Sequence, residues 1–252
     1  MIRVHVHGAS GRLGQAIVRV AECEGKYRLS LSGRNDDLAR LLADAEVAID
    51  VSQPEGSLTI AEACAAERKP LVIGTTGHSA VQLVELRSKP IPVLLAPNFS
   101  VGVNLLFWLT EKAAAILGRE YDAEIVEMHH RLKKDSPSGT AKRLGEIIAE
   151  ARGQKHSVQH GRVGIVGPRA ENEIGMHAVR GGDIVGEHTI YFAGSGERLE
   201  LTHRASSREA FARGALRAAE WLIGKPVGWY EMKDVLGLDQ QTKSGGTRTR
   251  SR

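Results

Sequence analysis

The start of the chain constrains the fold most, because a strand-like segment there runs directly into three regularly spaced glycines. Residues 2–7 alternate in side-chain character and predict a first strand. Small or apolar residues at helical spacing follow, at Ala16, Ile17, Val20 and Ala21. In a dinucleotide-binding turn, glycines let the backbone approach a pyrophosphate, which rests on the next helix N-terminus. Such a turn is predicted at Gly8-Ala9-Ser10-Gly11-Arg12-Leu13-Gly14, although the G-x-x-G-x-x-G spacing alone is weak evidence.

Further strands alternate with short helical patterns through the first hundred residues. We expect strands at residues 27–32, 47–51, 70–73 and 91–96, and a helix at residues 57–66. This alternation predicts a parallel, doubly wound α/β sheet, which binds ligands at the carboxyl ends of its strands. The polar or glycine-rich turns at those ends are the candidate cofactor contacts: the glycine turn that begins at Gly8, Arg34, Gly74-Thr75-Thr76 and Pro97-Asn98-Phe99.

The end of the second predicted strand bears on the choice of cofactor. An acidic residue at this position usually binds the adenosine ribose of NAD, whereas an arginine favours the 2′-phosphate of NADP. Gly33 occupies the expected position of the acid, and Arg34 follows it. We therefore expect NADPH to be the preferred cofactor, with NADH also usable. Two alternatives stay open: Asp36 or Asp37 reaches the ribose in a shifted register, or Arg34 is only a loop cation.

From residue 103 the pattern changes and predicts a second domain. A helix up to Gly118 and a strand over residues 123–128 come first, and strands at residues 175–180, 184–193 and 197–205 follow with no helix between them. This order predicts an α+β domain with an open mixed sheet. We expect a dinucleotide-binding domain at residues 1–100, completed by a C-terminal helix within residues 208–240. Residues 101–207 would form a substrate-binding and oligomerisation domain.

The segment from Glu127 to Thr140 gathers the chemistry of the second domain. His129, His130, Lys133 and Lys134 lie just before a helix that begins near Thr140. The run Asp135-Ser136-Pro137-Ser138 supplies candidate N-cap residues and a proline at its start. Cationic side chains beside a helix N-terminus suit a small dicarboxylate, and imidazoles can donate protons to it. A solvated loop is the plain alternative. Metal binding by Glu127, His129 and His130 is disfavoured, because adjacent strand residues point to opposite faces.

Composition excludes several other classes of protein. The chain has 252 residues and two cysteines, which argues against a disulfide framework or a zinc site. The chain shows neither a signal-like segment nor a membrane-length apolar run, so we expect a cytoplasmic protein without membrane contact. Four cations in the tail account for the whole net charge of +4, so we expect no nucleic-acid partner. Residues 241–252 predict a disordered basic tail.

Taken together, these motifs resemble the 4-hydroxy-tetrahydrodipicolinate reductase (dihydrodipicolinate reductase) family. The resemblance extends to about Leu238 and depends most on His129-His130 followed by Lys133, Asp135 and Pro137-Ser138-Gly139-Thr140. The other matching segments are Gly8 to Gly14, Gly74 to Gly77, Asn98 to Gly102 and Arg180 to His188.

The resemblance implies NAD(P)H-dependent reduction of a cyclic dicarboxylate on the route to lysine. It implies that His129 and Lys133 are catalytic and that His130, Lys133, Gly139 and Thr140 bind substrate. It also implies cofactor contacts at Gly8 to Leu13, Gly74 to Thr76 and Ala96 to Phe99, no metal, and a homotetramer built through the second domain. Gly33 departs from the acidic residue common in the family, and Ser136 replaces a more usual alanine. Two other functions stay open: a dehydrogenase of another small acid, and a non-catalytic dinucleotide sensor.

Overall fold

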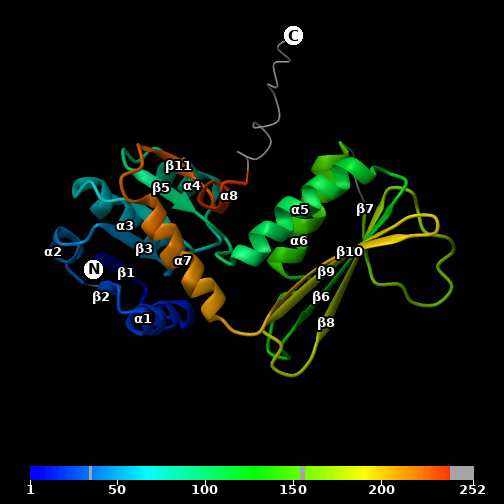
Figure 1. The fold of residues 1–252 in the computed structure, drawn as a ribbon, viewed down its shortest axis with the longest axis horizontal. Coiled ribbons are helices and arrows are strands. Elements are labelled where there is room, and N and C mark those ends of the chain that lie inside the picture. Colours follow the sequence, from blue (N-terminus) through cyan, green and yellow to red (C-terminus); the bar gives the residue numbers. More distant parts are fainter. Residues whose placement is uncertain (34–35, 154–156, 239–252) are drawn as a thin grey trace, which may run out of the picture. The chain divides into compact units, whose positions relative to one another are not determined.

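A computed structural model describes residues 1–33, 36–153 and 157–238 and divides into two compact units (Figure 1). Unit 1 comprises Met1–Val101 and the chain from Arg208 onward, and unit 2 comprises Gly102–Ser207. Arg34 and the predicted tail at residues 241–252 lie outside the described residues. Within the described ranges, the helices are all too short or too polar to cross a membrane.

Unit 1 is built on a six-stranded sheet in which every neighbouring pair of strands is parallel. The order across the sheet is β11-β5-β4-β3-β1-β2. The strands are β1 (Ile2–His7), β2 (Tyr27–Ser32), β3 (Val47–Asp50), β4 (Leu71–Ile73), β5 (Pro92–Leu95) and β11 (Gly228–Tyr230). Because successive side chains of a strand point to opposite faces, Val4 and Val6 enter one apolar layer while His5 and His7 face the other way.

Helices cover both faces of this sheet. One layer packs on Val4 and Val6 and contains α1 (Arg12–Glu24), α7 (Glu209–Leu222) and α8 (Met232–Leu236). The other layer contains α2 (Leu38–Ala43), α3 (Pro54–Ala66) and α4 (Ala80–Arg87). The predicted doubly wound α/β class is confirmed. The helix expected within residues 208–240 is present as α7, but it does not span the segment: Gly224, with a positive φ, follows α7, and β11 and α8 complete the segment.

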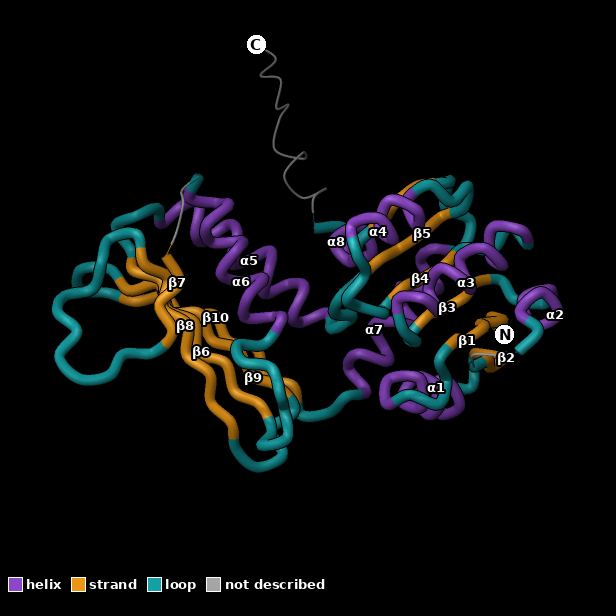
Figure 2. The backbone as a smooth tube through the Cα atoms, turned by 180° about the vertical axis from the view of Figure 1, so that it is seen from behind, coloured by secondary structure: helices purple, strands orange, loops and turns teal. Residues whose placement is uncertain are grey.

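Unit 2 has a five-stranded mixed sheet in the order β10-β9-β6-β8-β7. Its elements are α5 (Val101–Leu117), β6 (Asp122–His129), α6 (Gly139–Arg152), β7 (Ser157–His160), β8 (Glu173–Arg180), β9 (Gly186–Ala193) and β10 (Arg198–Ala205). Strand β6 pairs parallel with β8 and antiparallel with β9, so the predicted mixed sheet is confirmed. Helices α5 and α6 pack on one face of it (Figure 2).

The alternation of β6 separates two kinds of side chain. Ala123 and Ile125 enter the apolar layer beneath the helices, and Glu127 and His129 continue the same face toward the end of the strand. Glu124 lies on the opposite face, where it binds Arg162, Arg169 and His177. The end of β6 therefore brings two ionisable side chains to the helix-covered side of the sheet.

Candidate active site

The glycine turn between β1 and α1 has the backbone geometry that its sequence predicts. Gly8 has a positive φ of 84°, and a Cβ there would come within 2.8 Å of the carbonyl carbon of Val51. A Cβ on Gly14 would lie 2.4 Å from the carbonyl oxygen of Gly8. The N-cap of α1 is Gly11, which makes no side-chain capping hydrogen bond. This helix N-terminus therefore keeps backbone N–H groups available to an anion such as a pyrophosphate.

A cavity of about 650 Å³ adjoins this turn. It opens at the carboxyl ends of β1, β2 and β3 and at the first turn of α3. Its lining comprises His7, Gly8, Ser10, Gly11, Gly33, Val51, Ser52, Gln53, Glu55, Gly56 and Thr59. Its volume is in the range of cofactor pockets, and its position is where doubly wound sheets bind dinucleotides. The residues present therefore fit one half of a nicotinamide dinucleotide.

The other predicted cofactor contacts have different surroundings. The hydroxyl of Thr75 is buried and donates to Asp50 at 2.7 Å, and the ring of Phe99 is buried against Gly74. Thr76 and Pro97 are exposed, whereas Ala96 belongs to the core. These side chains mainly shape the turns at the ends of β4 and β5, so any cofactor contact by Thr75 or Phe99 would involve their backbone.

In unit 2, the predicted motif forms the connection between β6 and α6. Ser138 is the N-cap of α6, and its hydroxyl oxygen accepts a hydrogen bond from the N–H of Ala141 at 3.2 Å. Gly139 and Thr140 are therefore the first two residues of this helix, which begins one residue before the start predicted at Thr140. Backbone N–H groups in a first helical turn have no acceptor within the helix, and the helix dipole favours an anion there.

A carboxylate–imidazole pair lies at the end of β6. Nδ1 of His129 lies 2.6 Å from Oε2 of the fully buried Glu127. Arg180 binds the two oxygens of Glu127 at 2.7 and 2.8 Å, and the N–H of Ser138 donates to Oε1 at 3.0 Å. Burial alone would raise the pKa of Glu127, but these hydrogen bonds outweigh it and lower the pKa to about 2. Glu127 is therefore a carboxylate at neutral pH and holds Nδ1 of His129 as the donor.

The opposite side of the His129 ring is kept open by a glycine. A Cβ on Gly186 of β9 would lie 3.0 Å from Nε2 of His129. His188, two residues further along β9, packs edge-on against His129, with ring centroids 5.2 Å apart, and lies 3.0 Å from the hydroxyl of Ser138. Burial and the neighbouring His129 lower the pKa of His188 to about 3, so His188 stays neutral. Nε2 of His129 is thus the ring nitrogen directed away from Glu127.

Lys133 and His130 lie in the loop between β6 and α6. The ammonium of Lys133 forms a salt bridge of 2.9 Å with Asp135, and its backbone N–H donates to the carbonyl of His130 at 3.1 Å. Lys133 is only partly exposed, whereas Lys134 is exposed. This loop therefore holds one cation beside the start of α6 and leaves the other in solvent.

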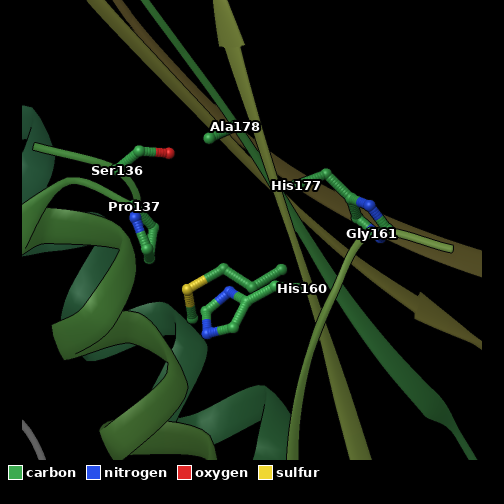
Figure 3. Close-up of a pocket in the computed structure, with 7 residues that line it drawn as sticks. Ser136, Pro137, His160, Gly161, His177 and Ala178 are labelled. Atoms are coloured by element: carbon green, nitrogen blue, oxygen red, sulfur yellow. The ribbon is translucent and has the colours of Figure 1, made fainter.

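A second cavity, of about 380 Å³, lies beside the same loop (Figure 3). Ser136 and Pro137 line one side of it, and Gly161 lines the other. Its remaining lining is His160, Met176, His177 and Ala178. None of the residues in the predicted substrate set lines this cavity, so it adds nothing to the dicarboxylate site.

The contacts of Glu127 bear on the metal alternative. Its two oxygens already bind His129, Arg180 and Ser138, and an arginine does not ligate metals. In the part of the chain that the structure describes, no group of three or more metal-ligating side chains is arranged to hold an ion.

Several residues of this site were missing from the predicted set. From the sequence, Glu127 is a candidate only as a metal ligand, although its i, i+2 spacing from His129 on one strand signals that the two side chains share a face. Arg180 and His188 lay inside a family motif but had no predicted role. They reach the site because β8 and β9 flank β6.

Comparisons with known proteins agree over nearly the whole described chain. The family model described as "Dihydrodipicolinate reductase, N-terminus" matches residues 2–99, and "Dihydrodipicolinate reductase, C-terminus" matches residues 102–236. A 4-hydroxy-tetrahydrodipicolinate reductase of Akkermansia muciniphila is 52% identical over 95% of this chain and 100% of its own. The enzyme of that name from Anaeromyxobacter dehalogenans is 48% identical over 94% of this chain and 98% of its own.

Solved structures show the same architecture. The dipicolinate-bound dihydrodipicolinate reductase from Paenisporosarcina sp. TG-14 has a TM-score of 0.77 and 25% identity, covering 92% of this chain and 97% of that chain. A probable dehydrogenase from Thermotoga maritima has a TM-score of 0.59 at 11% identity, covering 94% of this chain and 93% of that chain, and shares the fold alone.

Proposed function

The chain belongs to the dihydrodipicolinate reductase family, and we propose that it reduces 4-hydroxy-tetrahydrodipicolinate to tetrahydrodipicolinate in lysine and diaminopimelate biosynthesis. Overall, the substrate loses water and takes up a hydride and a proton. The matching names of relatives that are 45–52% identical over nearly their full length support this activity.

The cofactor half of the proposal is assigned to unit 1. A bound nicotinamide dinucleotide would supply the hydride. The turn from Gly8 to Gly14 would hold its pyrophosphate, since the glycines permit close backbone approach and the N-terminus of α1 favours negative charge. The choice of NADPH over NADH depends on Arg34, which lies outside the described residues, and remains a prediction from the sequence.

The substrate half is assigned to the connection between β6 and α6. The backbone at Gly139 and Thr140 would hold one carboxylate at the N-terminus of α6, and the ammonium of Lys133 would bind another. The bound dipicolinate of the Paenisporosarcina enzyme is consistent with a pyridine-ring dicarboxylate as the ligand class. His130, the first residue after β6, would contact the same ligand.

Proton transfer is assigned to His129. Hydride addition to a conjugated ring leaves an electron-rich enamine that must be protonated. Glu127 holds Nδ1 of His129, so Nε2 is the nitrogen that can deliver a proton, and the buried carboxylate stabilises the imidazolium form. The Glu127–His129 pair is the observation that supports this role best, because a binding protein without chemistry has no use for an oriented imidazole. Lys133 would be a second proton donor.

The assay that tests this proposal couples the purified chain to freshly generated substrate. Pyruvate and aspartate semialdehyde are condensed by the preceding synthase, and the loss of NAD(P)H absorbance is followed. We expect oxidation of the nucleotide that requires both precursors. Nucleotide oxidation that is independent of the condensation product, or its absence with either nucleotide, would show that the proposed function is wrong.

Two further properties are proposals from family membership. We place the chain in a homotetramer formed through the unit 2 sheet, whose β6 face opposite α5 and α6 is without helix cover in the described residues. We also place the reaction in the cytoplasm. Light scattering of the purified chain measures the first, and fractionation of producing cells measures the second.

A further inference from the structure

A row of buried polar side chains crosses the α3-covered face of the unit 1 sheet, and the predicted function does not use it. His5 and His7 of β1 lie opposite Ser30 and Ser32 of β2 in the parallel register. Both histidines are buried, and they share one serine: Nε2 of His5 lies 2.9 Å and Nδ1 of His7 lies 2.8 Å from the hydroxyl of Ser32. Valine or another apolar residue would fill this layer at less cost, because buried imidazoles must be hydrogen-bonded.

The hydrogen bond that Ser30 donates at one end of this row determines the direction of the other hydrogen bonds in it. The hydroxyl of Ser30 donates to the backbone carbonyl of Leu41 at 3.3 Å, so its oxygen must accept from Nδ1 of His5 at 2.9 Å. Burial, with a smaller contribution from His7, lowers the pKa of His5 to about 4, so His5 is neutral at neutral pH and its Nε2 is an acceptor. Nε2 therefore accepts the proton of Ser32.

His7 completes the row. Since the one hydroxyl proton of Ser32 points to His5, its oxygen accepts from Nδ1–H of His7. A neutral His7 consequently carries its proton on Nδ1 and presents a bare lone pair at Nε2. Within the described residues, that nitrogen makes no hydrogen bond. His7 lines the 650 Å³ cavity, and a Cβ on Gly56, another lining residue, would come 3.3 Å from Nε2.

We propose that His7 binds the adenosine ribose of the nicotinamide cofactor, with Nε2 accepting a hydrogen bond from the 2′- or 3′-hydroxyl. This inference rests on the proposed function, which supplies the dinucleotide. In a dinucleotide the adenosine ribose is bonded directly to the pyrophosphate. The cavity that His7 lines is continuous with Gly8, Ser10 and Gly11 of the phosphate turn, so the ribose is the ligand group that lies nearest.

This role would compensate for the absence of an acidic residue at the end of β2. Doubly wound dehydrogenases ordinarily accept the ribose hydroxyls with a carboxylate at that position, and here the position is Gly33. The nearby Asp36 already accepts the N–H of Gly33 at 2.8 Å. Nε2 of His7, on the neighbouring strand β1, takes over the acceptor role of the missing carboxylate. Unlike a carboxylate, it can lose its acceptor capacity by protonation.

Burial and the charged groups around His7 shift its pKa in opposite directions. Burial lowers the pKa of His7 below its ordinary value of 6.5, and Asp50 of β3 and Asp36 after β2 partly oppose that shift. His5 of β1 is itself neutral, since burial and His7 lower its pKa, and Glu55 of α3 lines the same cavity. Nε2 is therefore an acceptor at neutral pH and becomes a donor only as the pH falls below 6.5.

The test is calorimetric titration of the full chain with NADH and with two NADH analogues, whose adenosine ribose lacks the 2′- or the 3′-hydroxyl. For the parent at neutral pH, one analogue should bind about threefold to tenfold more weakly than NADH, the effect of one neutral hydrogen bond. His7→Val should weaken NADH by a similar factor and abolish the difference from that analogue. Which analogue shows the difference identifies the hydroxyl.

Two variants separate this role from a packing role. His7→Gln offers a side-chain oxygen near the same place and should keep part of the difference. Val4→Ala removes buried volume from the opposite face of the same strand and should leave the difference unchanged. In the parent, the difference should also shrink as the pH falls below 6.5, because protonated Nε2 no longer accepts, whereas His7→Gln should not show this change.

Three results would overturn the inference. If His7→Val weakens NADH and both analogues equally, His7 contributes only packing. If the parent binds NADH and turns over but does not distinguish either analogue from NADH, His7 does not bind the ribose while the proposed function stands. If the parent binds neither NADH nor NADPH, the proposed function and the inference are both wrong.

Discussion

Nδ1 of His129 lies 2.6 Å from Oε2 of Glu127, two residues earlier on the same face of β6. The carboxylate is fully buried and is bound on its other sides by Arg180 and the N–H of Ser138. It therefore has a fixed position and a fixed charge. An imidazole held in this way has one tautomer and one direction in which its second nitrogen can deliver a proton.

Glu127→Gln should lower kcat on the order of a hundredfold, because the amide keeps the shape of the side chain but not the charge that stabilises the imidazolium. Steady-state kinetics measure this. Glu124→Gln is the matched control, since Glu124 lies on the same strand, binds His177 at 2.7 Å and has its pKa lowered to about 2, but faces the other side of the sheet. Burial alone would raise the Glu124 pKa, and hydrogen bonds from Arg162, His177 and Arg169 outweigh it. A similar loss of kcat in both variants would assign the effect to the fold and not to His129.

His129→Gln and Lys133→Ala should have different kinetic signatures. Without an acid at position 129, kcat should fall by about a hundredfold or more at nearly unchanged cofactor affinity. Lys133→Ala should lower kcat and also raise KM for the dicarboxylate, because the Lys133 ammonium would bind a carboxylate of the substrate. Turnover within a few-fold of the parent in both variants would contradict both assignments.

Pyridine-2,6-dicarboxylate should compete with substrate and not with NAD(P)H. Its two carboxylates match the two anion-binding groups assigned here, at Lys133 and at the start of α6 with Gly139 and Thr140. Pyridine-2-carboxylate lacks one of them and should bind at least about tenfold more weakly, since a charge-assisted hydrogen bond contributes roughly 1.5–3 kcal/mol. Inhibition constants of the two compounds decide this, and equal values would argue against the two-carboxylate geometry.

Arg34→Ala should weaken NADPH and leave NADH nearly unchanged. A guanidinium suits the 2′-phosphate, and one charge-assisted hydrogen bond contributes roughly 1.5–3 kcal/mol, or about 10- to 150-fold in affinity. Salt reduces this margin, so the titrations belong at one fixed ionic strength. A variant that loses affinity for NADH as much as for NADPH would show that Arg34 does not bind the phosphate.

The stability of the fold should fall in two stages as the pH is lowered. His5 and His188 have pKa values of about 4 and about 3 in the folded chain, against 6.5 when unfolded, because both are buried. Below pH 6.5 the unfolded state binds protons that the folded state does not, so each should contribute a loss of about 3 kcal/mol by pH 4.

Glu127 adds the second stage. Its folded pKa of about 2 is below the ordinary 4.5, so its contribution is present above pH 4.5 and is lost as the pH falls toward 2. Denaturant melts across this range measure both stages. His188→Gln should flatten the curve between pH 6.5 and 4 while leaving the steeper fall below pH 4.5, and an unchanged slope above pH 4.5 would contradict the role of the buried histidine.

Local patterns in the sequence determined the parts of the site whose geometry is set within a few residues. Three glycines in seven residues predict the turn between β1 and α1, because any Cβ at Gly8 or Gly14 would collide with neighbouring backbone. The run Asp135-Ser136-Pro137-Ser138 predicts a helix start near Thr140, and in the structure Ser138 is the cap that accepts the N–H three residues later. Strands β1, β2 and β10 lie within one residue of their predicted ranges, whereas β8 begins two residues earlier and β9 two residues later than predicted.

Cross-strand neighbours were decided only by the tertiary structure. Arg180 reaches Glu127 from a strand 53 residues away, and His188 reaches His129 across β6 and β9, because these contacts depend on strand order and register. His5 and His7 look alike in the sequence, yet only His7 lines the cavity. The short elements α2, α4, β7, β11 and α8 were also missed, since segments of three to eight residues form through packing more than through their own periodicity. The sequence therefore determines which side chains the site can use. The strand order and register of the sheet determine which of those side chains come into contact, because they pair segments that are far apart in the chain.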